Sequence, residues 1–395
     1  MHNFDNIGFL LREVIVLTPV FIPLFWGLVF ITSEFSKNKA RYWLGIFMIV
    51  TATLYGCHAL FFLTTMDVYI KTDWLYNLTS LSVYPMYYIY IRLLTCDVKL
   101  KKNYITHFLP AIILSSSLLI ISLTLTHEEK VHYYEIVLKE YGMPGFGASS
   151  ALKLMSVIFY LSRIIFGFQT IIYLILGYIL ATRHNKRIAN FYSNMQGREL
   201  IWVKMLSISF LITSCASSVA NILGRGLFID NNSMLAFPAF IFSTMFFIIG
   251  ILGNNQNFTV NTFNEDEETE CPEENENPKN IKLKNNLIKL LEVNKRFLDP
   301  ELKITDLCRE LNTNRTYLSN LINTEFQLSF NDLINKYRTE YAITLLNGDN
   351  INYSLQVIAT ESGFGSLSSF NRAFKKNTGT TVTVFKSTNL QSAIN

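Results

Sequence analysis

Seven stretches of about 20 mostly apolar residues fall within the first 255 positions of the chain. A helix of about that length, rising 1.5 Å per residue, crosses the roughly 30 Å hydrocarbon core of a bilayer. The stretches cover residues 14–32, 42–65, 74–95, 104–125, 151–181, 202–223 and 235–253. Only 16% of the residues are charged, and the mean hydropathy of +0.25 is high for a soluble protein. Residues 1–255 are therefore predicted to form a bundle of seven transmembrane helices.

Positive charges are distributed unevenly among the connections between these stretches. Three alternate connections hold most of them: Lys37, Lys39 and Arg41; Lys99, Lys101 and Lys102; Arg183, Lys186, Arg187 and Arg198. The other connections hold Lys71, Lys130, Lys139 and Arg225. Because Lys and Arg are retained on the cytoplasmic side, the N-terminus is predicted to lie outside and the C-terminus in the cytoplasm.

Four side chains within the apolar stretches suggest a ligand pocket. His58 and Arg163 are ionisable, and ionisable groups in a membrane are costly. Tyr84 and Tyr88 share a helix face beside Pro85, where a kink is expected. Together they predict a pocket for an unknown signal ligand, either anionic or aromatic. The same residues also fit a structural role, with tyrosines near the interface, His58 bonded to a neighbouring helix and Arg163 snorkelling outward.

Two connections differ from the rest in composition. Residues 126–150 form a long acidic outer loop that either covers a binding site or serves only as a connector. Residues 256–278 carry eight acidic residues and no basic one, which predicts a disordered, self-repelling linker. This linker either acts only as a tether or competes with DNA for the domain that follows.

From residue 279 onward the pattern changes to short amphipathic helices. A stripe of leucines precedes a helix over 305–311, a break at Asn312–Thr313 and a second helix over 314–323. A long helix over 330–346 leads to a second such pair, over 354–362 and 366–376, joined by Gly363–Phe364. Helix, tight turn and helix is the arrangement that places a second helix in the major groove of DNA. Residues 279–395 are predicted to be a soluble domain with two such units, so the whole chain is predicted to be all-α.

The C-terminal motifs resemble those of the AraC/XylS family of transcription regulators. The matching positions fall in register over about 279–386: residues 314–319, Ser329–Phe330, residues 335–338, Ile358–Ala359, Gly363–Phe364 and residues 370–376. The resemblance is closest to the branch common in Bacteroidetes-type bacteria, and it implies that two recognition helices enter successive major grooves. It does not extend to the first 255 residues.

The resemblance also implies which side chains touch DNA. By motif position, the residues facing base edges are Thr316, Ser319 and Asn320 in the first recognition helix and Ser368, Asn371 and Arg372 in the second. Asn pairs with adenine and Arg with guanine, which agrees with this assignment. Phosphate contacts are expected from Arg315, Lys375, Lys376 and Lys386. Arg372 has an alternative role in a salt bridge within the domain.

The C-terminal end departs from the family pattern. The proline expected after Gly379 is replaced by Val382, and the final aromatic residue is followed by Lys386 instead of Arg.

These observations predict a one-component transcription regulator in a bacterial inner membrane, with double-stranded DNA, the lipid bilayer and RNA polymerase as partners. A homodimer is expected as well, because paired domains gain effective concentration at a two-site operator. The spacing of Cys and His fits no zinc site, and His58, His107 and the serines form no nucleophile and base set. No enzyme activity, cofactor or metal is therefore predicted. The alternative is a membrane receptor or transporter whose C-terminal domain docks a protein partner.

Overall fold

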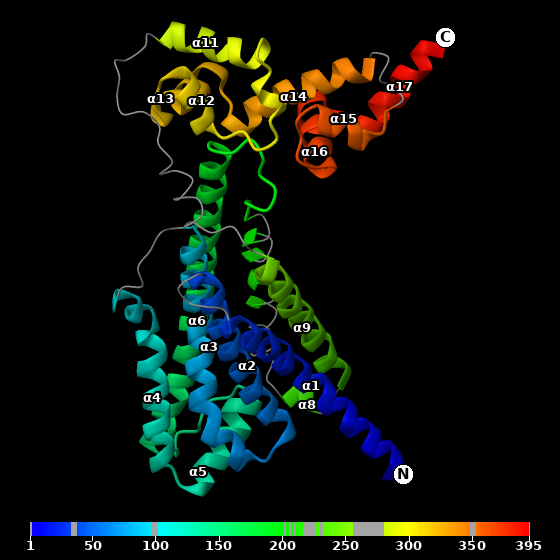
Figure 1. Ribbon diagram of the computed structural model, residues 1–395. Coiled ribbons are helices and arrows are strands. Elements are labelled where there is room, and N and C mark those ends of the chain that lie inside the picture. The colour runs from blue at the N-terminus through cyan, green and yellow to red at the C-terminus, as the bar shows by residue number, and fades with distance from the viewer. Residues whose placement is uncertain are drawn as a thin grey trace. The chain divides into compact units, whose positions relative to one another are not determined.

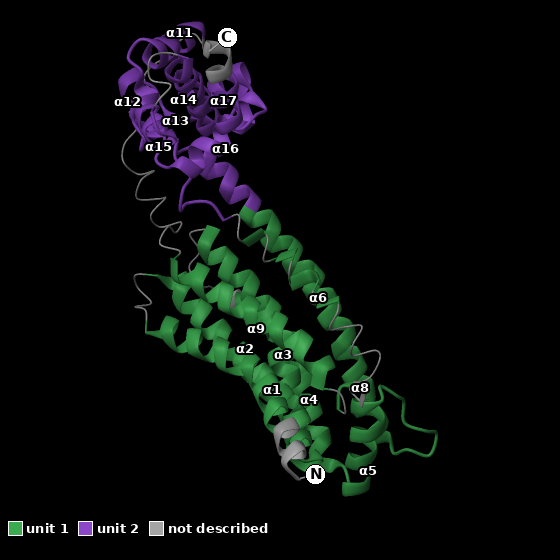
Figure 2. Ribbon diagram, turned by 90° about the vertical axis from the view of Figure 1, so that its right-hand side faces the viewer, with its two compact units in different colours: residues 1–181, 201–260 green, residues 182–200, 261–395 purple. Residues whose placement is uncertain are grey.

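The structure of the protein is a computed structural model. It describes residues 2–32, 38–95, 102–200, 226–229, 232–255, 280–347 and 353–394, and within the segment 201–225 it describes 203–204, 207–208, 210–212 and 214–215. The chain divides into two compact units (Figure 2). Unit 1 comprises residues 1–181 and 201–260, and unit 2 comprises residues 182–200 and 261–395. The acidic linker predicted at 256–278 lies outside the described residues.

Unit 1 is built from long helices (Figure 1). They are α1 (His2–Ile31), α2 (Lys39–Leu63), α3 (Met66–Thr95), η1 with α4 (Lys102–Phe108, Leu109–Thr124), α6 (Ser150–Ala189, which passes into unit 2 at residue 182) and α9 (Asn232–Asn255). The short α8 (Gly226–Ile229) precedes α9. Within the described residues, five helical segments are long and apolar enough to cross a membrane: 10–31, 39–63, 104–124, 150–189 and 232–255. The predicted helical, apolar architecture is confirmed at this level.

The third and sixth predicted spans are not among these five segments. The third corresponds to α3, which begins at Met66, eight residues before the predicted start, and most of its residues from Asn77 onward are buried. The buried residues of α3 include tyrosines, serines and threonines that pack inside unit 1. The sixth lies mostly outside the described residues, although its described positions are helical.

Close helix packing in unit 1 relies on glycines. A Cβ on Gly250 in α9 would lie 2.2 Å from the Trp26 indole of α1, and one on Gly253 would lie 2.4 Å from Leu44 of α2. The backbones of α1 and α2 approach at Gly45, where a Cβ would lie 3.0 Å from the Ile31 nitrogen. Because glycine lacks a side chain, the three helices can pack at short distance.

The segment over 126–150 is ordered where a loop was predicted. Thr126 and Glu129 form a capping box that starts α5 (His127–His132), and a π-helical stretch (Tyr133–Lys139) follows. Asp73 of α3 accepts hydrogen bonds from the Tyr133 hydroxyl at 3.0 Å and from the Tyr69 hydroxyl at 3.1 Å. The buried Asp73 carboxylate thereby fastens this segment to α3.

Unit 2 contains the C-terminal helices and residues 182–200, which comprise the last turns of α6 and the chain that follows. The C-terminal elements are α11 (Asn280–Glu292), η3 (Arg296–Leu298), α12 (Ile304–Leu311), α13 (Arg315–Leu321), η4 (Ile322–Phe326), α14 (Phe330–Asn347), α15 (Leu355–Glu361), α16 (Leu367–Thr378) and α17 (Val382–Ile394). Every helix predicted for this domain is present, within about two residues.

The central helix α14 contacts elements of both halves of this domain (Figure 1). The first half buries residues of α11, α12 and α13, including Leu287, Leu307 and Leu318. The second half has its own core, in which Phe364, Phe370 and Phe374 pack against Ala342 and Leu346 of α14. Burial of apolar surface thus joins both halves to α14, the first through η3 and η4 and the second through α15, α16 and α17.

Candidate nucleic-acid interface

The first predicted recognition helix is α13. The Asn314 side chain caps it by accepting a hydrogen bond from the Tyr317 amide at 2.9 Å. Leu318 and Leu321 are buried, which turns Thr316 and Asn320 to the exposed side of the helix. Of the other predicted DNA contacts on α13, Arg315 and Ser319 are half-buried.

The second predicted recognition helix is α16. The Ser366 side chain caps it by accepting from the Ser369 amide at 3.2 Å, while Phe370, Ala373 and Phe374 are buried. The predicted DNA contacts on this helix all lie on its exposed side: Ser368, Asn371, Arg372, Lys375 and Lys376. The structure thus presents a polar exposed face on each of the two predicted recognition helices.

Several of the predicted cationic contacts have partners within unit 2. Arg372 pairs with Glu199 at 3.3 Å, and Lys376 pairs with Asp332 of α14 at 2.6 Å. Lys386, in α17, donates to the Tyr353 carbonyl at 2.7 Å. Arg372 thus forms a salt bridge, but its partner Glu199 lies outside residues 279–395, where a partner within the domain was the predicted alternative.

The turn before α16 requires glycine at position 363. Gly363 has φ +80°, a left-handed conformation that is unfavourable for residues with a side chain. A Cβ there would also lie 2.7 Å from the Leu298 backbone. This contact between the second turn and the first half of the domain explains why glycine precedes Phe364.

Arg338 of α14 is a structural residue to which the sequence interpretation assigned no role. Its side chain is buried, with Nε donating to the Phe297 carbonyl at 2.7 Å and Nη2 to the Asp299 carbonyl at 2.6 Å. Burial lowers the pKa of Arg338 to about 10, although the charges of Asp299 and Glu301 oppose this effect. The guanidinium therefore remains charged at neutral pH. Its only sequence signal was its place in the 335–338 motif.

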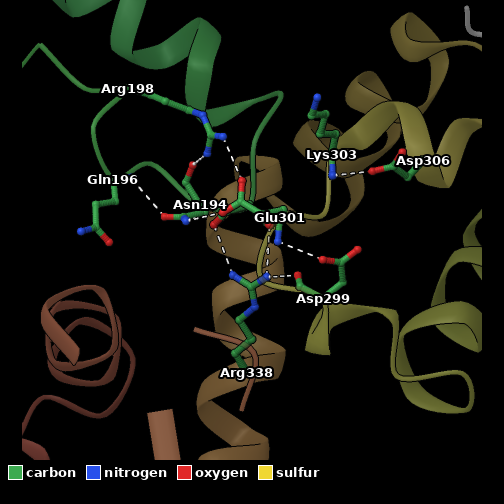
Figure 3. Close-up of polar contacts among 9 residues, drawn as sticks. Asn194, Gln196, Arg198, Asp299, Glu301, Lys303, Asp306 and Arg338 are labelled. Carbon is green, nitrogen blue, oxygen red and sulfur yellow. Dashed lines mark hydrogen bonds and ion pairs between the residues drawn. The ribbon is translucent and has the colours of Figure 1, made fainter. Parts of the chain in front are cut away.

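Residues 191–199, here called the docking segment, pack against the C-terminal helices within unit 2 (Figure 3). An antiparallel bridge joins Tyr192 to Lys303: the Ser193 amide donates to the Leu302 carbonyl at 3.1 Å, and the Ile304 amide donates to the Phe191 carbonyl at 2.9 Å. Sequence patterns carry no signal for this pairing, because its two residues lie more than 100 positions apart.

The predicted pocket residues in unit 1 separate into different places. His58 and Tyr84 line a cavity of about 120 Å³, with Tyr55, Tyr76, Phe166, Phe210, Phe242 and Phe246 among its other walls. Tyr84 bonds to Ser214 there. Tyr88 instead packs against His107 and Tyr173, and Arg163 lies over the Phe159 and Tyr76 rings at 4.6 and 5.1 Å without lining the cavity. Only two of the four predicted residues are brought together.

Comparison with known families places the C-terminal domain. Residues 307–388 match a family described as a helix-turn-helix domain. No curated protein and no solved structure matches the chain. Among the described residues, no group of three or more His, Cys, Asp or Glu side chains is arranged to hold a metal ion. The matched range contains α13, α16 and the turn at Gly363, so residues 307–388 are an AraC-type helix-turn-helix domain.

Proposed function

We propose that this protein is a membrane-embedded transcription regulator that binds specific DNA through α13 and α16 in response to a signal sensed by unit 1. The observation that carries the proposal is the pair of capped helices in the two halves of one domain, each with an apolar face buried and a polar face exposed. Two such helices in one domain are the arrangement that reads successive major grooves.

The chemistry of the exposed faces supports sequence-specific binding. Asn320 on α13 and Asn371 on α16 suit adenine, and Arg372 on α16 suits guanine. A good bidentate pair of this kind discriminates against a wrong base by about 1–3 kcal/mol. Lys375 and Lys376 supply charge for phosphates, and we propose that Arg315 and Lys386 do the same from α13 and α17.

The cavity at His58 and Tyr84 supports a sensing role for unit 1. Its volume of about 120 Å³ is close to that of an engineered cavity known to hold benzene, about 150 Å³. Aromatic walls with a few hydroxyl groups and one imidazole suit a neutral single-ring ligand better than an anion. We therefore favour an aromatic signal over an anionic one.

The test of DNA recognition is genome-wide crosslinking of the intact protein in its native membrane. The Asn320→Ala/Arg372→Ala double variant removes one base contact from each recognition helix and should lose the discrete binding sites of the wild-type protein. An Asn285→Ala/Arg309→Ala control removes the same side-chain types from the exposed sides of α11 and α12. This control should retain the sites.

Salt dependence separates DNA binding from the docking of a protein partner. Binding that neutralises phosphates weakens steeply as salt rises, because counterions are released. If no discrete sites appear with intact protein in the membrane, and binding to duplex DNA is independent of salt, the proposal fails. Crosslinking would then be used to look for a protein that docks on the C-terminal domain, such as RNA polymerase or a second copy of the chain.

A further inference from the structure

The docking segment contacts both helix-turn-helix units of the DNA-binding domain. At the first helix-turn-helix unit, the Ile304 amide that begins α12 donates to the Phe191 carbonyl. Just before α12, Glu301 accepts hydrogen bonds from Arg198 Nη2 and Asn194 Nδ2, each at 2.9 Å (Figure 3). In the second helix-turn-helix unit, Asn194 packs against Gly365, where an added Cβ would lie 2.6 Å from Asn194 Nδ2. Glu199 then reaches Arg372 on α16.

Ser193 is the residue through which α14 holds this segment. Its carbonyl accepts from Asn331 Nδ2 at 2.6 Å and from Arg338 Nη1 at 3.4 Å, while its hydroxyl accepts from Arg338 Nη2 at 3.1 Å. With the amide bonded to Leu302, all the polar groups of Ser193 face partners in the DNA-binding domain. Such complete satisfaction of buried polar groups is typical of a specific interface.

Apolar burial and charge strengthen the same contact. Phe191 and Tyr192 are buried, and the Arg198 guanidinium lies 4.3 Å from the centre of the Tyr192 ring. Burial alone would raise the pKa of Glu301, but the hydrogen bonds from Arg198 and Asn194 outweigh it and lower that pKa. The docking segment is therefore held by backbone pairing, buried aromatic rings and a charged cluster together.

The position of Glu199 opposes DNA binding. Its carboxylate forms an ion pair with the guanidinium of Arg372, the side chain proposed to read guanine. In this position it holds a negative charge where a base edge or phosphate would approach. We infer that the DNA-binding domain carries a surface for the chain's own segment 191–199, and that this segment and DNA compete for α16. The inference rests on the proposed function.

The chain connectivity links this surface to the apolar bundle. The docking segment begins two residues after α6 ends, and α6 is one of the helices long and apolar enough to cross a membrane. A displacement of α6 acts on residues 191–199 directly through the backbone. Release of the segment frees Arg372, so undocking is the step that increases DNA affinity.

A disulfide lock tests the docking itself. A Cβ at position 365 would lie 3.4 Å from Asn194 Cγ, the place that a cysteine Sγ at 194 would take, so Asn194→Cys/Gly365→Cys should crosslink on oxidation. The experiment uses the full chain in lipid nanodiscs, with each single variant as control for the native cysteines. If the double variant forms no more crosslink than the single variants, the docked arrangement is wrong.

The same protein then tests competition with DNA. The probes are duplexes from the crosslinked genomic sites and a random 40-base-pair duplex, and the readout is fluorescence anisotropy. Oxidation should weaken binding of the genomic duplex at least fivefold, with full recovery on reduction. Glu199→Gln should strengthen it about two- to fivefold, the range for an exposed ion pair. Glu310→Gln, which removes the same charge beside Arg296, should leave it unchanged.

Three results separate the two proposals. Crosslinking with equal DNA affinity in the oxidised and reduced protein refutes competition and leaves the segment a structural contact. Binding only by the reduced or Glu199→Gln protein supports both proposals. Crosslinking without salt-dependent DNA binding in any variant refutes the proposed function, and the competition with it, while the docking remains established by the disulfide.

Discussion

Replacing the buried Arg338 by methionine should lower the free energy of unfolding of unit 2 more than substitution of an exposed residue does. Arg338 donates short hydrogen bonds to the carbonyls of Phe297 and Asp299, and hydrogen bonds from a charged donor contribute about 1.5–3 kcal/mol each. Methionine fills much of the same volume but donates nothing, so both carbonyls lose their charged partner. A buried polar group left without a partner costs about 1–3 kcal/mol.

The expected loss combines these effects. The Phe297 carbonyl is left without a partner, which costs about 1–3 kcal/mol. The Asp299 carbonyl keeps the Leu302 amide as a donor but loses a charged bond of about 1.5–3 kcal/mol, and release of the buried guanidinium from its desolvation offsets part of the sum. We expect a net loss of about 3 kcal/mol in the free energy of unfolding. Arg338→Lys should lose a similar amount, because one ammonium group does not reproduce the planar geometry that serves both carbonyls.

Pulse proteolysis of the full chain in nanodiscs measures this loss. Urea is varied, and the fraction of intact C-terminal fragment gives the unfolding midpoint. Lys336→Met is the matched control, since it removes a positive charge from the exposed side of the same helix and should change stability by less than about 0.5 kcal/mol. A midpoint for Arg338→Met equal to that of Lys336→Met would refute the assigned role of the buried guanidinium.

Three further predictions use similar comparisons. Gly363→Ala should lower the free energy of unfolding of unit 2 by at least about 3 kcal/mol, and Gly379→Ala by about 1–2 kcal/mol. Both glycines have φ +80°, but only at position 363 does an added Cβ meet backbone atoms. Equal losses in the two variants, measured by pulse proteolysis, would contradict this. The pKa of Glu301 is lowered, so its carboxylate stabilises the fold above pH 4.5, its usual pKa, and this contribution is lost as pH falls through the pKa in the folded protein. The stability difference between wild type and Glu301→Gln should therefore disappear on acidification. A constant difference would show that the charge of Glu301 is not involved. Gly250→Leu should lower the melting temperature of unit 1 while Gly56→Leu does not, because a Cβ at 250 meets Trp26 and one at 56 meets nothing. The melting temperature is measured by the exposure of the buried Cys57 to a thiol-reactive dye. Equal melting temperatures for the two variants would count against this packing.

Local signals in the sequence were sufficient for the DNA-binding domain. Asn314 and Ser366 cap their helices, and glycine at 363 takes the left-handed turn between α15 and α16. Val382 stands near the place of the usual proline, yet α17 begins there, with the Thr381 side chain accepting from the Val384 amide at 3.4 Å. These signals act within four residues, so pattern and periodicity reveal them.

The pocket in unit 1 shows where such reasoning ends. Tyr84 and Tyr88 share a helix face by spacing, but neighbouring helices divide that face, so Tyr84 meets Ser214 while Tyr88 meets His107 and Tyr173. Asp73 was missed because it lies before the predicted start of its span, and its partner Tyr133 lies 60 residues away. Periodicity gives the direction of a side chain from its own helix and not the identity of its neighbour.

The amino-acid sequence by itself determined the helical, apolar character of the first 255 residues and the two helix-turn-helix units of the last hundred, because both depend on short-range periodicity and capping. Only the tertiary structure decided that Ser193 bonds to Arg338, 145 residues away, and that Glu199 pairs with Arg372. Pairs so far apart in the chain meet through packing and desolvation of whole surfaces, which no local pattern encodes.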